Sequence, residues 1–340
     1  MQTETISALP TIASRYLEHR LPSAGQVRVR DMKRGAIGSS RAMWFFHAEW
    51  DGEAEISHEL AFRADESTCF RDEYEEGLDR EFKVYQSLHE TGIPVPRNYW
   101  YETDPAWIGE PFVIRELLPG RSNLQNDPPG FQRRVLENFV DVLAAQHTLD
   151  WEKAGLSFLG APDDPVSGGV ALVDKWDRIA QSELLQPLPM ASAVVTWLRA
   201  HLPTKADRIS LNQGQVGPGQ FLFDDEARIV AQLDWEQAFL GDPMSDMAYF
   251  VFQVRPLVGD FVDDLLARYT ERSGIPIREE NLLFYSVFQS FWAVAHCWTG
   301  LNRFANNQHR QLQTLQLGLR VPQFFVRLMH SQISAGIPGG

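Results

Sequence analysis

The chain has 340 residues, with 31 lysines and arginines against 45 aspartates and glutamates, so its formal net charge is −14. This length suffices for two domains or for one large two-lobed domain with its own core, and a hydrophobic content of 44% excludes a disordered chain. A nucleic-acid-binding protein needs a basic face, so the acidic balance argues against a nucleic-acid partner.

The two cysteines, Cys69 and Cys297, lie far apart and form no CxxC pair, which predicts reduced thiols rather than a disulfide framework. Residues 1–16 lack the basic start and apolar run of a signal peptide. No stretch approaches 18 uninterrupted apolar residues, the length that a membrane span needs. We therefore expect a cytoplasmic protein without a membrane partner, and a homodimer stays open as its assembly state.

The first third of the chain predicts strands with two helices. Apolar residues recur at near-helical spacing over 5–20, whereas residues 27–30 alternate as they do in a strand. The other elements expected here are a strand over 42–50 that turns at Asp51-Gly52, a strand over 60–63, a helix over 72–91 and a strand over 111–118.

After residue 120 the pattern becomes mainly helical. The expected elements are helices over 131–150, 174–183 and 190–202, a strand hairpin over 220–234, and further helices with Phe and Trp stripes over 244–334. Runs of strands followed by runs of helices favour an α+β fold over a parallel sheet.

Two features of the N-terminal third have the chemistry to contact phosphates. The small-residue stretch from Gly35 to Ser40 lies between two strands, where backbone N–H groups can approach a triphosphate, although a plain turn has the same composition. It matches neither the GxxxxGK[ST] loop nor a GxGxxG turn before a helix. Arg63 ends the next strand and can reach phosphates, and Glu81 can hold that cation, unless both are solvated surface charges.

The segment from Leu211 to Phe223 is unusual, because a loop with three Gln, one Pro and closely spaced Gly leads straight into an apolar strand. Asp234 ends the hairpin that follows. A carboxylate there suits Mg²⁺, which binds few protein carboxylates together with substrate phosphates. Asp242 and Asp246 lie four residues apart at an expected helix start, where N-capping and helix-dipole roles are the plainest interpretation.

These motifs carry a resemblance. The hairpin with Leu233-Asp234-Trp235-Glu236 and Leu240-Gly241-Asp242-Pro243 resembles the aminoglycoside phosphotransferase and choline kinase family, in particular a bacterial branch akin to the kinase-like domain fused to some acyl-CoA dehydrogenases. The resemblance covers most of the chain. It implies a bilobal protein-kinase-like fold, with a nucleotide-binding lobe over 1–118 and a helical lobe over 119–340 that holds the catalytic loop and the acceptor pocket.

The resemblance also implies cofactors and the residues that bind them. In the family, ATP or another nucleotide lies against three features: a nucleotide loop, a cation that contacts the phosphates and is held by a helix residue, and the hinge between the lobes. The matching positions here are Gly35, Gly38, Ser39 and Ser40 for the loop, Arg63 and Glu81 for the ion pair, and Glu116 and Leu118 for the hinge. Asp234 and Gln220 match the family's Mg²⁺ ligands.

The catalytic loop departs from the family pattern. The family reads His-Gly-Asp, four residues, then Asn, whereas the same register here reads Gln213-Gly214-Gln215, four residues, then Gln220. The family's Asp orients and accepts the substrate hydroxyl proton, and a neutral amide at Gln215 cannot accept a proton at neutral pH. Gln220 still offers an amide oxygen to a metal. Gln213 replaces a His that mainly braces the loop.

Three functions therefore stay open. The first is a kinase-like protein that binds a nucleotide with Mg²⁺ but transfers phosphate slowly or not at all. The second is an active small-molecule phosphotransferase that acts on a hydroxyl of an apolar or acyl-type substrate and uses another acidic group as base, because a loose transition state asks little of a base. The third is a different reaction in the same cleft. The aromatic residues between 249 and 298 mostly fit a core, and any of them that line the cleft favour an apolar ligand over a polycationic aminoglycoside.

Overall fold

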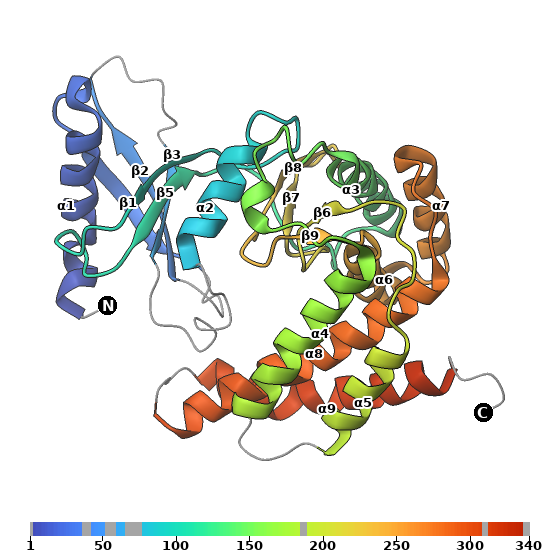
Figure 1. The fold of residues 1–340 in the computed structure, drawn as a ribbon. Helices are drawn as coiled ribbons and strands as arrows, with labels where there is room; N and C mark the ends of the chain where they lie inside the picture. Colours follow the sequence, from blue (N-terminus) through green and yellow to red (C-terminus); the bar gives the residue numbers. More distant parts are fainter. Residues whose placement is uncertain are drawn as a thin grey trace.

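The computed structural model describes residues 3–35, 42–51, 59–64, 77–183, 189–307 and 312–335. It confirms the α+β class and the two lobes: an antiparallel sheet with α1 and α2 forms the smaller lobe, and helices dominate the larger one (Figure 1). No helix in these ranges is long and apolar enough to cross a membrane.

The smaller lobe is built on a five-stranded antiparallel sheet in the order β1-β2-β3-β5-β4. The strands are β1 (Arg28–Arg34), β2 (Ala42–Glu49), β3 (Glu59–Ala64), β4 (Asn98–Glu102) and β5 (Phe112–Glu116). Helix α1 (Thr3–Arg20), followed by the short helix η1 (Pro22–Ala24), packs along one face of the sheet, because Leu9, Ala13, Tyr16 and Leu17 form one buried stripe.

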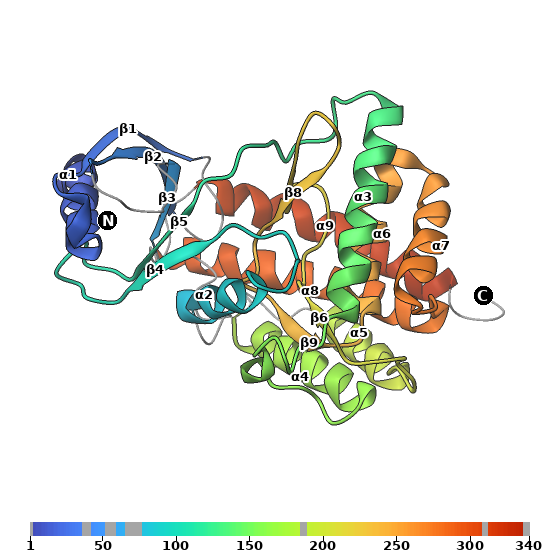
Figure 2. The same ribbon diagram turned by 90° about the horizontal axis from the view of Figure 1, so that it is seen from above.

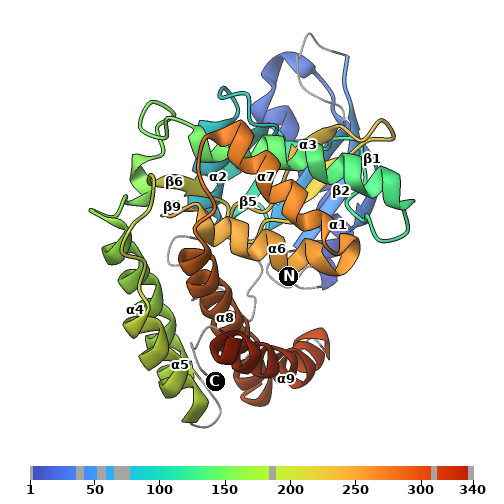
Figure 3. The ribbon, with the colours of Figure 1, turned by 90° about the vertical axis from the view of Figure 1, so that its right-hand side faces the viewer.

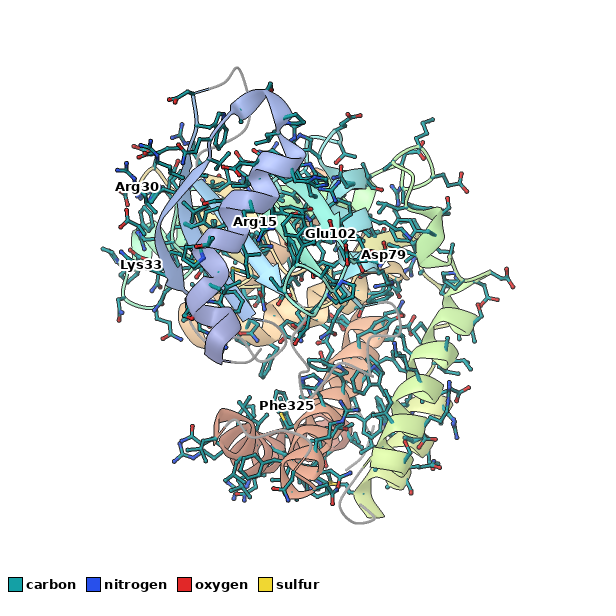
Figure 4. The ribbon with its side chains drawn as sticks, turned by 90° about the vertical axis from the view of Figure 1, so that its left-hand side faces the viewer. Arg15, Arg30, Lys33, Asp79, Glu102 and Phe325 are labelled. Carbon is teal, nitrogen blue, oxygen red and sulfur yellow. The ribbon has the colours of Figure 1, made fainter. Side chains whose placement is uncertain are left out.

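The outer edge of this sheet carries charge rather than apolar surface. Arg30 and Lys33 are exposed on β1, which is an edge strand, and lie at the rim of the lobe (Figure 4). Positive charge on an edge strand opposes pairing with another sheet. On the opposite side of α1, Arg20 pairs with Glu102 of β4 at 2.8 Å and so fixes the helix against the other edge.

Helix α2 (Gly77–Leu88) connects the two lobes. Its buried face, with Val84, Tyr85 and Leu88, shares a core cluster with Trp235 and with Leu211 of the larger lobe. The backbone N–H of Gln232 also donates to Pro94 O at 2.7 Å, just after this helix. The smaller lobe is therefore attached directly to the strands that carry the catalytic-loop residues (Figure 2).

The larger lobe surrounds two short strand pairs. Helices α3 (Pro129–Thr148), α6 (Met244–Val258) and α7 (Phe261–Ser273) enclose β6 (Ser210–Asn212) paired with β9 (Phe239–Gly241), and β7 (Phe221–Phe223) paired with β8 (Ile229–Gln232). Below them, η3 (Ser157–Leu159) precedes an arm of α4 (Pro165–Glu183), α5 (Pro189–Ala200), α8 (Glu279–Ala305) and α9 (Leu312–Ala335) (Figure 3).

Helices α8 and α9 approach each other closely at Gly318. A Cβ atom at this glycine would meet Leu301 Cβ at 2.6 Å and Cys297 O at 3.1 Å. Only glycine therefore fits at this crossing, and the Cys297 thiol beneath it is buried and forms no disulfide among the described residues.

Most element types agree with the sequence predictions, with two kinds of difference. Helix α4 begins at Pro165, nine residues before the expected start. The sequence does not predict its first turns because Gly168 and Gly169 have low helix propensity. The short strands β4, β6 and β9 were not expected, since three to five residues carry too little periodicity. For the helix over 72–91, residues 72–76 lie outside the described part.

Candidate functional site

The side chain of Gln213 braces the catalytic loop from inside. It is fully buried, and its amide donates to Leu233 O at 2.7 Å and to Asp234 O at 2.8 Å. Its Oε1 accepts the backbone N–H of Gln215 at 3.0 Å. A neutral imidazole has one donor and one acceptor, whereas an amide group has two donors and an acceptor. Gln213 therefore makes three hydrogen bonds at a position where a neutral histidine could make two.

Asp246 of α6 holds the backbone of the same loop. Its Oδ2 accepts the N–H of Gln213 and its Oδ1 accepts the N–H of Gly214, both at 2.8 Å. Its own N–H donates to Asn212 Oδ1 at 3.3 Å. Asp246 is completely buried, so these charge-assisted bonds compensate the loss of hydration. The carboxylate thus fixes the loop instead of capping the helix from outside.

A buried polar chain extends from Asp246 into the core. Gln146 donates to Asp246 Oδ2 at 3.0 Å and to Leu211 O at 2.8 Å, and its own Oε1 accepts from Gln232 at 2.7 Å. His147 lies against the same carboxylate at 3.2 Å and against the Tyr269 hydroxyl at 2.8 Å. Such a buried network rigidifies the core on which the loop rests, while Gln232 Oε1 has no hydrogen-bond partner among the described residues.

Gly214 is required by the tight passage of the loop. Its φ is +95°, and a Cβ there would come within 2.9 Å of both Cβ and O of Gln237. Any side chain at this position would displace the segment that follows Asp234.

Gln215, Gln220 and Asp234 are brought to the same end of the hairpin. The N–H of Leu233 donates to Gln220 O at 2.8 Å, so Gln220, just before β7, lies close to the segment after β8 that contains Asp234. The side chains of Gln215, Gln220 and Asp234 are all half-buried. The backbone thus brings the three residues to one end of the hairpin, and their roles toward a metal or a substrate stay a prediction.

Asp234 has a left-handed backbone with φ of +64°. Such a conformation costs a non-glycine residue about 1 kcal/mol or more and persists where neighbours impose it. Here the Tyr85 hydroxyl accepts the N–H of Asp234 at 3.0 Å, and Gln213 binds the carbonyl of Asp234. Tyr85 also contacts Arg115 of β5 at 3.5 Å.

The structure describes only some of the residues that are expected to bind the nucleotide. Gly35 follows β1, whereas Gly38, Ser39 and Ser40 lie outside the described residues. Arg63 pairs in register with Val113 in the middle of the sheet, but its side chain is not among those described. Glu81 is buried on α2. The ion pair between Arg63 and Glu81 stays a prediction.

The expected hinge follows β5. The Glu116 carboxylate accepts the N–H of Arg97 at 3.1 Å, and Leu118 is half-buried two residues further on. Arg121 then exchanges two backbone hydrogen bonds with Phe223, at 3.0 and 3.1 Å. The segment after the hinge therefore extends the β7–β8 hairpin and lies against the catalytic loop, where Gly219 donates to Ser122 O.

Two further groups near the loop are protonatable. Burial raises the pKa of Asp242 to about 6, against hydrogen bonds from the Met244 N–H and the Asn281 amide, which lower it. Burial raises the pKa of Tyr249 to about 12, and the nearby Asp234 carboxylate acts in the same direction. The Tyr249 hydroxyl is therefore protonated at neutral pH and does not offer a basic oxygen there.

A cavity of about 230 Å³ opens beside the loop. Its wall includes Gly214 and the residues after Asp234, together with α2, α4, α8 and the start of α6. The polar and charged groups in the wall include Arg80, Lys175, Glu236 and Gln289, and the aromatic ones include Trp176 and Trp292. Phe288 and Trp292 line this cavity, whereas most other aromatic residues between 249 and 298 belong to the core. That the cavity is the acceptor pocket stays a prediction.

Sequence reasoning missed the supports of the site. The sequence predicts Tyr85 and Gln146 as helical residues, and nothing in their local pattern indicates a partner about 150 or 100 residues away. Asp246 had a local signal, an acidic residue in a first helical turn, but that signal indicates a cap.

Comparison with known proteins agrees with this geometry. A model of the phosphotransferase enzyme family matches residues 53–280. Acyl-CoA dehydrogenase family member 11 from Homo sapiens is 30% identical over 216 residues, which are 61% of this chain and 27% of that protein. The chain thus spans less than a third of the length of this curated relative.

Solved structures of similar fold cover nearly the whole chain. A protein of Ralstonia eutropha, assigned as an aminoglycoside phosphotransferase, superposes with a TM-score of 0.73 at 21% identity and covers 94% of this chain and 98% of its own. The aminoglycoside phosphotransferase APH(4)-Ia, in complex with ADP and hygromycin B, has a TM-score of 0.65 at 16% identity, with 96% and 99% covered. At these identities the likeness shows the fold alone.

Proposed function

Since the chain belongs to the phosphotransferase enzyme family, we propose that it is a kinase-fold protein that binds a nucleotide with Mg²⁺ but transfers phosphate slowly or not at all. One observation carries the proposal: the catalytic loop is fully braced by Gln213 and Asp246, while the position of the general base holds the neutral Gln215. The scaffold is kept and the proton acceptor is absent.

In this proposal residues 1–118 hold the nucleotide and residues 119–340 carry the loop and a small-molecule pocket. The nucleotide contacts are Gly35, Gly38, Ser39, Ser40, Arg63 with Glu81, and the hinge at Glu116 and Leu118. A neighbour of the same fold was solved with ADP, which supports a nucleotide at the equivalent position. ATP in the cytoplasm, where the Cys297 thiol stays reduced, is the natural occupant.

The donor set near the loop fits Mg²⁺. Magnesium keeps several waters and is usually bound by one or two carboxylates plus substrate phosphates. Asp234, after β8, would supply a carboxylate and Gln220, before β7, an amide oxygen. When bound with a nucleotide, the metal would neutralise phosphate charge. The Tyr85 hydroxyl accepts the backbone N–H of Asp234 and so orients this residue. The backbone N–H of Gln220 donates to Gly217 O, which fixes Gln220 in a turn.

Loss of the base accounts for slow transfer. A general base typically contributes 10²- to 10⁴-fold to rate, and an amide at Gln215 cannot take the acceptor proton. Tyr249, the hydroxyl near Asp234, has a pKa of about 12 and does not replace it.

An active phosphotransferase is the second candidate, favoured by one observation. Glu236 is 8% exposed and lies in the wall of the cavity that begins at Gly214, so a carboxylate is available near the acceptor pocket. The acceptor would be a hydroxyl on an apolar or acyl-type substrate, which agrees with the relatives' name as acyl-CoA dehydrogenase family members. A repurposed cleft with non-kinase chemistry is the third.

Calorimetric titration with ATP and ADP, with and without MgCl₂, followed by an ADP-release screen over hydroxylated metabolites, separates these functions. Mg²⁺-dependent nucleotide binding without turnover is the expected result. Turnover with an acceptor would establish the second function instead. A folded protein that binds no nucleotide would overturn the proposal and leave the repurposed cleft.

A further inference from the structure

A buried arginine lies at the end of β5 without a carboxylate partner. Arg115 is 7% exposed. Its guanidinium contacts the Tyr85 hydroxyl and Met43 Sδ, both at 3.5 Å, and its Cζ lies 5.9 Å from the centre of the Tyr85 ring. Among the residues that the structure describes, no carboxylate pairs with it. A hydroxyl at this distance and a thioether are weak acceptors, so they compensate little of the hydration that a buried cation loses.

More exposed arginines do have the partner that Arg115 lacks. Arg268 pairs with Asp141 and Arg278 with Asp207, each at 2.7 Å. Arg115 is more deeply buried than either, and the cost of an uncompensated charge rises with burial. A ligand that carries acceptor atoms would supply what the described part of the chain does not.

The side chain of Arg115 lies on the face of the sheet against which α2 packs. Phe112 and Ile114 of the same strand belong to the cluster under α1, so Arg115 points to the opposite face, where it meets α2 (Figure 1). Met43, its second contact, belongs to β2, the strand that follows the expected nucleotide loop. The guanidinium therefore lies between the expected hinge at Glu116 and the strand after that loop.

The chemistry of a guanidinium distinguishes the two common purines. It carries five N–H donors in a planar fork and has no acceptor. Guanine presents two acceptors on one edge, O6 and N7, and such a fork binds both at once. Adenine presents N7 beside the N6 amino group, which is itself a donor. Against Arg115, the adenine edge would therefore set donor against donor at one of the two positions.

We propose that Arg115 selects the base of the nucleotide. Its guanidinium donates to O6 and N7 of a purine that has a carbonyl group at C6, so the site prefers GTP to ATP, and ATP binds at the same place more weakly. The inference rests on the proposed function, because it takes the base to lie against the hinge at Glu116 and Leu118. It deepens that function by naming the base and the residue that recognises it.

The test is calorimetric titration of the full chain with GTP, ITP and ATP, each with MgCl₂. Hypoxanthine, the base of ITP, shares the C6 carbonyl of guanine and lacks its N2 amino group, so ITP isolates the contact with O6 and N7. GTP and ITP should each bind about tenfold more tightly than ATP, which is within the discrimination expected of one bidentate pair. ATP binding as tight as ITP binding would overturn the inference, since the C6 carbonyl would then make no difference.

A variant pair assigns the preference to one side chain. Arg115→Met replaces the guanidinium by a neutral unbranched chain, and it should lower the affinity for GTP and ITP about tenfold without lowering that for ATP. Arg15→Met is the matched control, since Arg15 is exposed on α1, on the other side of the sheet (Figure 4). An equal loss of affinity for all three nucleotides would place the guanidinium on the phosphates and overturn the base assignment. An unchanged preference in the Arg115 variant would overturn it as well.

Wild-type protein provides a second measurement if Arg115→Met does not fold. In 7-deaza-GTP a carbon replaces N7, so one of the two acceptors is lost, and this analogue should bind about tenfold more weakly than GTP. Equal affinity for the two would overturn the inference.

The outcomes separate this inference from the proposed function. Nucleotide binding without a preference for the C6 carbonyl would overturn the inference alone. A folded chain that binds none of the three nucleotides would overturn the proposed function, and the inference with it.

Discussion

The hydroxyl of Tyr85 accepts the backbone N–H of Asp234 at 3.0 Å, across the junction between the two lobes. The bond links α2 to the residue whose carboxylate is the proposed metal ligand, and it holds that residue in a left-handed conformation. Movement of α2 would therefore change the direction of the Asp234 side chain, so the two lobes are coupled at this atom pair.

Replacing Asp234 by Ala should abolish Mg²⁺-dependent nucleotide binding. Asp234 is the charged member of the donor set, and Gln220 alone offers one neutral oxygen. Calorimetric titration of ATP with and without MgCl₂ measures the change. Asp225→Asn, an exposed aspartate in the β7–β8 turn, is the control. If the Asp234 variant kept the wild-type affinity and the same magnesium dependence, Asp234 would not be the main ligand.

Restoring a carboxylate at the base position should raise turnover. Gln215→Asp, alone or with Gln220→Asn, is expected to increase ATP hydrolysis on the order of 10²-fold, the lower range for a general base. Hydrolysis should respond first, because water is always present as acceptor. Gln215→Asn is a neutral control of the same length as the aspartate. ADP release and melting temperature are measured together.

Unchanged turnover in a folded Gln215→Asp variant that still binds Mg-nucleotide would mean that more than the base is missing. A repurposed cleft would then be the better account. A large fall in melting temperature would instead show that the loop does not accept a second carboxylate near Asp234.

Replacing Gln213 by His should destabilise the loop. The amide makes three hydrogen bonds and a neutral imidazole can make two, so the free energy of unfolding should fall by about 1 kcal/mol or more. Denaturant unfolding measures the loss. Gln125→His, at an exposed turn, is the control. Equal stability of the Gln213 variant and the control would show that the third bond contributes nothing.

Asp246→Asn should have a larger effect on stability. Asp246 accepts the N–H groups of Gln213, Gly214 and the Gln146 amide, and asparagine replaces one accepting oxygen with a donor. A buried donor facing other donors leaves several groups unsatisfied, at a cost of about 3 kcal/mol. Thermal unfolding tests this, with the exposed Asp263→Asn as control. A melting temperature equal to that of the control would contradict the support assigned to Asp246.

Asp242 predicts a specific dependence of stability on pH. Its pKa is about 6 in the folded protein and 3.8 as a model value, because burial disfavours the charged form. The folded state therefore binds the proton more tightly, and the stabilising contribution is complete below about pH 4 and lost as pH rises through 6. At about 1.4 kcal/mol per pKa unit, the loss is about 3 kcal/mol.

Asp242→Asn removes this titration and keeps a side chain of the same size. The melting temperature of the variant relative to wild type should rise between pH 4 and pH 7. Asp263→Asn, which changes an exposed aspartate, should show no such trend. A constant difference between the Asp242 variant and wild type would show that Asp242 does not titrate in this interval.

The sequence predicted the fold where long elements have clear periodicity or where a motif fixes the register. The hairpin with Asp234 and the helices around it are of this kind, and the two-lobed α+β architecture is confirmed. The sequence alone also shows that residue 215 is Gln, where the family pattern has Asp. The effect of this difference on catalysis stays a prediction.

The supports of the site could not be predicted in the same way. Tyr85 and Asp234 are 149 residues apart, and Gln146 and Asp246 are 100 apart. A polar residue on a helix has the same local pattern whether it faces water or a distant partner. Similarly, nothing in the sequence of α2 and α4 indicated that Arg80 and Lys175 share one cavity.

The amide of Gln213 has one more consequence. An imidazole changes its number of N–H donors as it takes up a proton, near pH 6.5 when unperturbed, whereas a carboxamide keeps the same two donors and one acceptor at every pH of a living cell. The contact between the catalytic loop and the carbonyls of Leu233 and Asp234 therefore does not respond to acidification. A loop held at this point by histidine would loosen or tighten as the pH changes, whereas the Gln213 contact stays the same.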